Sequence, residues 1–140
     1  MKHFHVVGAI IECGGKILCM QRPGGKYPST NYKWEFPGGK IEPGETGPQA
    51  LMRELREEMD FRVDVHEEDY FATVHHVYPE FELTMDTYLC RVTDPVFIRR
   101  EHLDHRWLAP ADMPALDWAA ADYPIVEKLA AGKPSTGRAG

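Results

Sequence analysis

The stretch that decides the fold runs from Gly39 to Glu58 and reads GKIEPGETGPQALMRELREE. Its second half predicts a helix that begins at Thr46, a residue type preferred at helix N-caps, because Gln49 follows three residues later and Pro48 lies in the first turn. Apolar side chains then recur at positions i, i+4 and i+8, namely Leu51, Leu55 and Met59. This spacing predicts a helix that ends near Met59 and turns one apolar stripe toward a core.

The same helix carries glutamates on the face opposite to that stripe. Glu54, Glu57 and Glu58 stand at i, i+3 and i+4, so their backbones lie within roughly 6 Å of one another along the helix axis. Three carboxylates this close repel one another unless a positive charge lies among them. A divalent cation would supply that charge, and Mg²⁺ suits the site because it takes oxygen ligands and is usually completed by substrate phosphates, with Mn²⁺ as a substitute. The alternative is a solvated helix face on which Arg53 and Arg56 pair with the glutamates.

The residues just before this helix weigh against the solvated alternative. Phe36-Pro37-Gly38-Gly39 predicts a short strand that breaks into a glycine loop. A solvated helix needs no such loop, whereas a phosphate site uses glycines to let backbone N–H groups approach an anion. Together, the loop and the acidic helix indicate a metal-dependent phosphate site.

Outside this region the chain is mainly strand-like. Strands are predicted at 4–12, 16–21, 34–36, 70–78, 81–92 and 105–108, with loops at 22–31 and 37–46. Adjacent glycines, Gly14 and Gly15, predict a tight hairpin between the first two strands, and Pro79-Glu80 separates another pair. A last helix is predicted at 121–131, followed by a small, polar tail at 132–140 that frays. Strands mixed with two helices indicate the α+β class.

Composition and charge exclude several classes of protein. A chain of 140 residues can bury one core but is too short for two full domains. Its 22 acidic and 16 basic side chains give a net charge of -6, which argues against a nucleic-acid polymer as partner. No segment approaches the run of about 18 apolar residues that a membrane span requires, so no membrane partner is expected. The three cysteines form no C-x-x-C pair, which is typical of a reduced cytoplasm.

The spacing of Gly39, Glu45 and the run Arg53–Glu58 resembles the Nudix box, the signature of hydrolases that cleave nucleoside diphosphates linked to another moiety. One position departs from the pattern, because Asp60 stands where the box has glycine. Aspartate tolerates the left-handed conformation that ends helices better than most residues, so we expect the turn to be kept. The resemblance implies a Nudix fold, a mixed β-sheet sandwiched between helices (α/β/α), in a single domain over residues 1–131.

Beyond the box, the likeness extends from Val6 to Leu129 and points to MutT-like nucleoside triphosphate pyrophosphohydrolases, including the CTP-type members. It implies a small-molecule nucleotide substrate, either canonical or modified as in 8-oxo-dGTP, that is cleaved to the monophosphate and pyrophosphate. It further implies sanitation of the nucleotide pool, a DNA-repair role, in the cytoplasm. The alternatives are hydrolysis of ADP-ribose, nucleotide sugars or dinucleotide polyphosphates, or a non-catalytic nucleotide sensor. The sequence leaves open whether the protein is a monomer or a homodimer.

The resemblance also implies roles for single residues. The expected metal ligands are Gly39, Glu54, Glu57, Glu58 and Glu101. The expected catalytic residues are Glu54, Glu57, Arg53 and Glu101. A general base would be Glu54, Glu57 or Glu101, while Arg53 orients a catalytic glutamate and Glu45 supports it. The expected substrate-binding residues are Arg22, Gly38, Lys40 and Asp122.

Several of these residues have a simpler interpretation. Glu101 is alternatively a surface charge and Arg22 a surface arginine. Asp122, if ionised, would accept hydrogen bonds from a base such as cytosine or guanine, but it could instead cap the last helix.

The histidines are interpreted as ordinary strand residues. His3 and His5 share a strand face but have no further metal ligands nearby in the sequence. His75 and His76 point to opposite faces of a strand and cannot chelate together.

Overall fold

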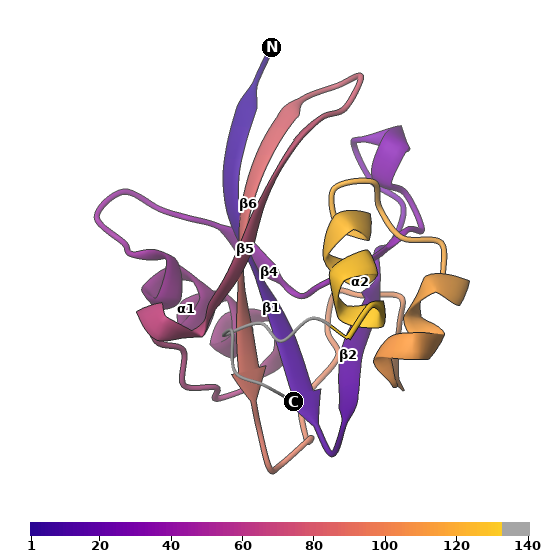
Figure 1. Ribbon diagram of the computed structural model, residues 1–140. Coiled ribbons are helices and arrows are strands. Elements are labelled where there is room, and N and C mark those ends of the chain that lie inside the picture. The colour runs from indigo at the N-terminus through magenta and orange to yellow at the C-terminus, as the bar shows by residue number, and fades with distance from the viewer. Residues whose placement is uncertain (133–140) are drawn as a thin grey trace.

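A computed structural model describes residues 1–132 of the chain, so the expected tail lies, apart from Gly132, outside the described residues. Its strands form one mixed sheet in the order β3-β2-β1-β6-β5, in which β4 also pairs with β1 and β7 with β2 (Figure 1). The strands are β1 His3–Cys13, β2 Lys16–Gln21, β3 Trp34–Glu35, β4 Gly38–Lys40, β5 Tyr70–Val77, β6 Glu82–Arg91 and β7 Asp104–Leu108. The pairing of β1 with β6 is parallel, and the other pairings are antiparallel. The expected mixed sheet is therefore confirmed.

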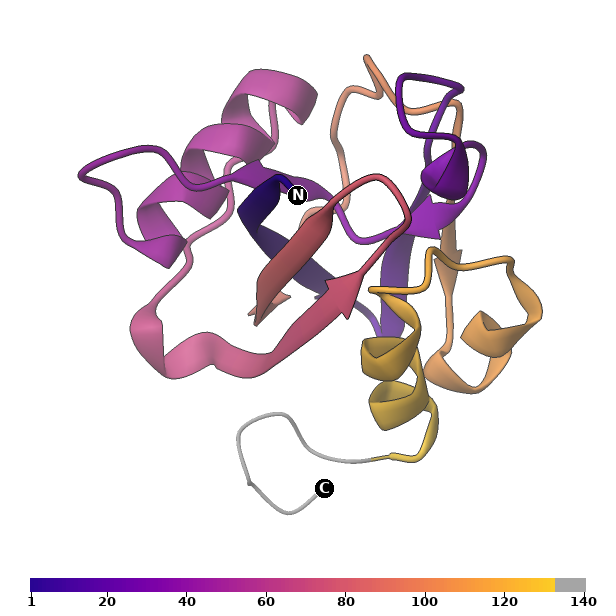
Figure 2. The same cartoon turned by 90° about the horizontal axis from the view of Figure 1, so that it is seen from above.

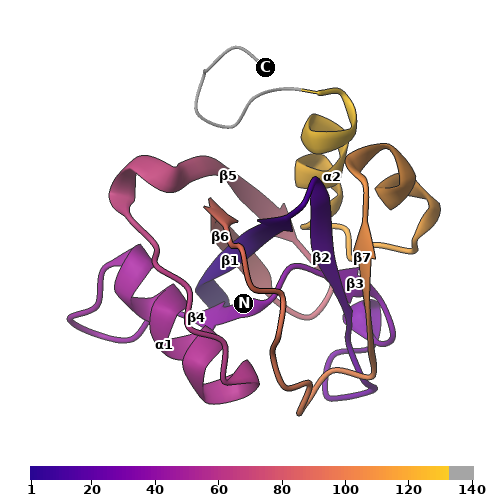
Figure 3. The same cartoon turned by 90° about the horizontal axis from the view of Figure 1, so that it is seen from below.

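Helices cover both faces of this sheet, which confirms the α/β/α arrangement (Figures 2 and 3). Helix α1, Gly47–Met59, packs its apolar stripe against Val7, Ala9 and Ile11 of β1. Helix α2, Tyr123–Ala130, and the 3-10 segment Pro110–Ala115 pack against the opposite face, where Ile10 of β1 points. Successive residues of β1 alternate between the two cores, as the period of a strand requires.

The ends of α1 follow the local sequence signals. Thr46 is the N-cap, and its side chain and that of Gln49 exchange hydrogen bonds with each other's backbone N–H groups. Asp60 ends the helix in the left-handed conformation, with φ 48 and ψ 36. The turn expected from Asp60 is therefore kept without glycine.

Among the strands and α-helices, two predictions differ from the structure by more than one residue. Residues 38–40 were expected in a loop, but they form β4, whose backbone pairs with Val6–Gly8 of β1. Glycines carry no side-chain signal for a strand, and the pairing partner lies some thirty residues away in sequence. Helix α2 begins at Tyr123, two residues later than predicted. Within residues 1–132, neither α-helix is long and apolar enough to span a bilayer.

Candidate functional site

A cavity of about 560 Å³ lies beside the sheet, and its lining comes from many parts of the fold. These parts are the N-terminal half of β1, the loop between β2 and β3, β3, β4, α1, the β5–β6 hairpin, and the segments just before β7 and α2. Its volume falls within the range of about 300–1,000 Å³ that is usual for small-molecule sites. The cavity has an acidic end and an aromatic end.

Three carboxyl groups meet at the acidic end: Glu54 and Glu58 of α1, and Glu101 of the loop before β7. Burial, then the charge of Glu54 and a hydrogen bond with it, and then Glu101, raise the pKa of Glu58 from 4.5 to about 9. A carboxyl that resists ionisation in this way lacks a positive neighbour, which a bound cation would supply. The donors are oxygens, so the residues present fit a divalent metal ion such as Mg²⁺ or Mn²⁺.

Gly39 brings the β4 backbone directly against Glu54. A Cβ atom at position 39 would stand 2.4 Å from the carboxyl carbon of Glu54. Only glycine leaves room for the carboxyl group here, so the glycine places main-chain groups of β4 beside the acidic end.

Arg53 links several groups at the acidic end of the cavity through hydrogen bonds. Its Nε and Nη2 donate to the two oxygens of Glu45 at 2.7 and 2.9 Å, and Nη1 donates to Glu54 Oε1 at 2.9 Å. Nη2 also donates to the carbonyl oxygen of Lys40 at 3.0 Å. These contacts lower the pKa of Glu45 to about 2 and raise that of Arg53. The guanidinium group therefore ties the loop, β4 and the Glu54 side chain into one unit.

The structure does not bring Glu57 to the same place. Its side chain is 53% exposed, lies 3.4 Å from Arg53 Nη1, and does not line the cavity. Its backbone carbonyl accepts a hydrogen bond from Arg100 Nη1 at 2.9 Å. Metal binding or catalysis by Glu57 therefore stays a prediction.

Replacing Arg53 by lysine is expected to lower kcat by about 10–100-fold, the usual cost of losing a group that orients a catalytic or metal-binding side chain. Lysine keeps the charge but cannot hold Glu45 at two points while also donating to Glu54. The measurement is kcat and KM at saturating metal. Arg56→Lys, an exposed position on the same helix, is the control and should leave kcat unchanged. Equal kcat values for the two variants would contradict the positioning role.

At the other end, Asp122 is buried and its Oδ1 accepts a hydrogen bond from the backbone N–H of Phe36 at 3.1 Å. Burial, followed by the charge of Glu35, raises the pKa of Asp122 well above its usual range. The ionised acceptor expected from the sequence is thus disfavoured, because burial penalises the charged form. A protonated carboxyl can donate a hydrogen bond as well as accept one.

The capping alternative for Asp122 is wrong. Asp122 occupies the N-cap position of α2, but its side chain makes no capping hydrogen bond. The carboxyl group instead bonds Phe36 and lines the cavity.

The remaining expected substrate-binding residues also line the cavity. Arg22 Nη1 donates to Glu35 at 3.3 Å, while its Nε is buried without a hydrogen-bond partner within residues 1–132. Lys40 places its Nζ 4.3 Å from the centroid of the Phe4 ring. Gly38 packs against the β1 backbone, since a Cβ there would meet Val7 O at 1.9 Å.

Sequence reasoning missed several residues of the aromatic end. Phe4, Tyr27 and Phe81 form edge-on or tilted ring contacts and line the cavity, as does Tyr78. Glu35 was also missed, although it joins Arg22 to His102, whose Nε2 lies 3.0 Å from Glu35 Oε2. These residues come from distant parts of the chain and form no motif, so no local signal could have grouped them.

Comparisons with known proteins agree with this fold. The NUDIX domain family matches residues 1–129. The CTP pyrophosphohydrolase of Escherichia coli (strain K12) is 35% identical over 141 residues, covering 94% of this chain and 94% of that protein. The 8-oxo-dGTP diphosphatase of Proteus vulgaris is 37% identical over 89 residues, covering 63% of this chain and 76% of that protein. The solution structure of the E. coli ORF135 protein superposes with a TM-score of 0.75 at 35% identity and covers 96% of both chains.

Proposed function

The chain belongs to the Nudix family of hydrolases, and on this premise we propose that it cleaves a nucleoside triphosphate to the monophosphate and pyrophosphate. The observation that carries the proposal is a single cavity with carboxyl groups at one end and an aromatic wall with a buried carboxyl at the other. The first end suits a metal-bound triphosphate and the second suits a nucleobase. Relatives named for CTP and 8-oxo-dGTP support a nucleoside triphosphate as the substrate.

At the acidic end, we propose that Glu54, Glu58 and Glu101 hold Mg²⁺ together with the Gly39 carbonyl. The cation supplies charge neutralisation for the phosphate oxygens and lowers the pKa of a water that it binds. Arg53 keeps Glu54 in place through its Nη1 contact. The base that takes a proton from the attacking water is Glu54, Glu57 or Glu101, of which Glu54 and Glu101 line the cavity.

Between the two ends, Arg22 and Lys40 supply positive charge along the cavity wall. The buried Nε of Arg22 lacks a partner within the described residues, so a phosphate or base oxygen could accept its hydrogen bond. Phe36 and Tyr78 would flank a base, and Asp122 would hydrogen-bond its polar edge. In the cell, this activity would remove altered nucleotides from the cytoplasmic pool.

The test is hydrolysis by purified protein with Mg²⁺ of CTP, dCTP, their 5-methyl forms and 8-oxo-dGTP, ranked by kcat/KM. We expect the monophosphate and pyrophosphate as products, and no turnover when the metal is removed by a chelator. Release of no pyrophosphate from any canonical, methylated or oxidised triphosphate would refute the proposal. A higher kcat/KM for ADP-ribose than for any triphosphate would instead favour that substrate class.

A further inference from the structure

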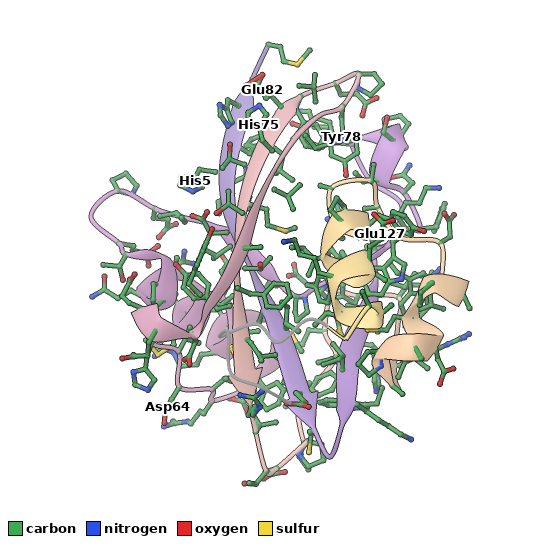
Figure 4. The ribbon with its side chains drawn as sticks, in the orientation of Figure 1. His5, Asp64, His75, Tyr78, Glu82 and Glu127 are labelled. Carbon is green, nitrogen blue, oxygen red and sulfur yellow. The ribbon has the colours of Figure 1, made fainter. Side chains whose placement is uncertain are left out.

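Outside the cavity, histidine and carboxylate side chains gather on three neighbouring strands near one end of the sheet. His3 of β1 lies opposite Glu82 of β6. His75 of β5 pairs with Thr84, two residues along β6 from Glu82, and Figure 4 labels both His75 and Glu82. The side chains of His3, His75 and Glu82 are 46%, 54% and 32% exposed, so an ion in solution can reach them. The strands thus bring together three groups that are far apart in the sequence.

The separations of the ligand atoms fit a small transition-metal ion. Glu82 Oε2 lies 3.4 Å from His3 Nδ1 and 3.6 Å from His75 Nε2. One ligand atom from each residue lies within 4.8 Å of those of the other two. In a tetrahedral zinc site with bonds of about 2.0–2.1 Å, ligand atoms are about 3.3–3.5 Å apart. The two distances to Glu82 Oε2 are therefore already close to those of a zinc site. A small side-chain rotation brings the two histidine nitrogens to the same separation.

Thr84 supports the rings from their other nitrogens. Its Oγ1 lies 2.8 Å from His3 Nε2 and 3.1 Å from His75 Nδ1. A hydroxyl oxygen has two lone pairs, so it can accept a hydrogen bond from both rings at once. Each ring then directs the lone pair of its remaining nitrogen toward Glu82. Histidines that bind metals typically have such a partner, which fixes the tautomer and the ring orientation.

We propose that His3, His75 and Glu82 form a second metal site, specific for Zn²⁺ or a similar transition-metal ion, with a fourth position open to water. Two imidazoles and one carboxylate favour zinc over magnesium, whereas the acidic end of the cavity offers oxygen donors. None of these three residues lines the cavity, and the adjacent residues Phe4 and Leu83, which do line it, point to the other face of the sheet. It does not depend on the proposed hydrolysis.

The site would join β1 to β5 across β6. A zinc ion bound only by the folded chain raises stability by mass action, because the three ligands are dispersed once the strands separate. His5, the next histidine on the same face, is not part of the site, since it pairs with Asp86 at 2.8 Å. It therefore provides a matched control.

The experiment is a zinc titration of metal-free protein in excess Mg²⁺, which occupies the oxygen site, with a chromophoric chelator as competitor. We expect one zinc ion per chain. His3→Ala and His75→Ala should each weaken zinc binding at least 10-fold, whereas His5→Ala should leave it unchanged. The thermal midpoint of the wild type should rise with Zn²⁺, and that of His75→Ala should not.

Cobalt gives an independent readout that does not involve activity. Co²⁺ bound at this site should show the strong visible absorption of a four-coordinate ion with nitrogen ligands, and His75→Ala should lose it. Zinc affinity and cobalt spectra that are the same in the wild type and in both His3→Ala and His75→Ala would overturn the proposal. So would a loss in His5→Ala as large as that in His75→Ala.

Discussion

Glu58→Gln is expected to lower kcat by about 10²–10³-fold and, at the same time, to make the metal-free protein more stable at alkaline pH. Glutamine has nearly the same shape but cannot carry the negative charge that holds a cation. In the metal-free protein, that charge is unfavourable because Glu58 is close to Glu54 and Glu101 and partly buried. One substitution should therefore move activity and stability in opposite directions.

The pH dependence follows from the raised pKa of Glu58. The folded state holds its proton up to about pH 9, while the unfolded chain releases it near 4.5. The contribution of Glu58 to stability is therefore complete below about pH 4.5 and is lost as the pH rises toward 9. The thermal midpoint of Glu58→Gln, relative to that of the wild type, should rise across this range when both proteins are metal-free. Adding Mg²⁺ should raise the midpoint of the wild type and have little effect on the variant.

Two comparisons isolate the role of this position. Glu127→Gln, an exposed glutamate on α2 (Figure 4), should leave kcat and the pH dependence unchanged. Glu57→Gln tests the other expected ligand on α1, and unchanged turnover would remove Glu57 from the set. A kcat of Glu58→Gln equal to that of the wild type would contradict the role given to Glu58. So would a difference in thermal midpoint between the two metal-free proteins that stays constant from pH 5 to 9.

The helix at the centre of this site could be predicted because its signals are local. Thr46 and Gln49 form the predicted N-terminal cap, and Asp60 adopts the predicted left-handed conformation. The face shared by Glu54 and Glu58 also follows from helical spacing alone. Spacing does not show how far each side chain is exposed, so it could not indicate that Glu57 lies outside the cavity lining.

The rest of the cavity depends on contacts between distant parts of the chain. Glu101 could be placed beside Glu58 only through the family resemblance, since its own loop carries no spacing signal. The strand β4 was missed because its partner is β1 and its first two residues are glycines. Likewise, His3 has no metal-binding neighbour in the sequence, and the parallel pairing of β1 with β6 brings it to Glu82.

Gly38→Ala is expected to destabilise the fold by about 3 kcal/mol or more, because there is no room for a side chain at this position. A Cβ atom would stand 1.9 Å from the carbonyl oxygen of Val7 and 3.0 Å from the Cα of Gly8. These are backbone atoms of the central strand β1, so the clash can be relieved only if β4 separates from β1. For a chain of this size, the midpoint of thermal unfolding should fall by on the order of 10 °C.

The neighbouring glycine should behave differently, although its Cβ atom would also clash. In Gly39→Ala the clash is with the carboxyl group of Glu54, at 2.4 Å, and the end of a side chain can rotate away. Gly39→Ala should therefore keep most of the stability but lose kcat, because Glu54 is displaced. Gly25→Ala, where nothing lies within 4 Å of the added atom, should change neither quantity. Two results would show that β4 does not hold the site in the way that these contacts require. One is a midpoint of thermal unfolding for Gly38→Ala equal to that of the wild type, and the other is an unchanged kcat in Gly39→Ala.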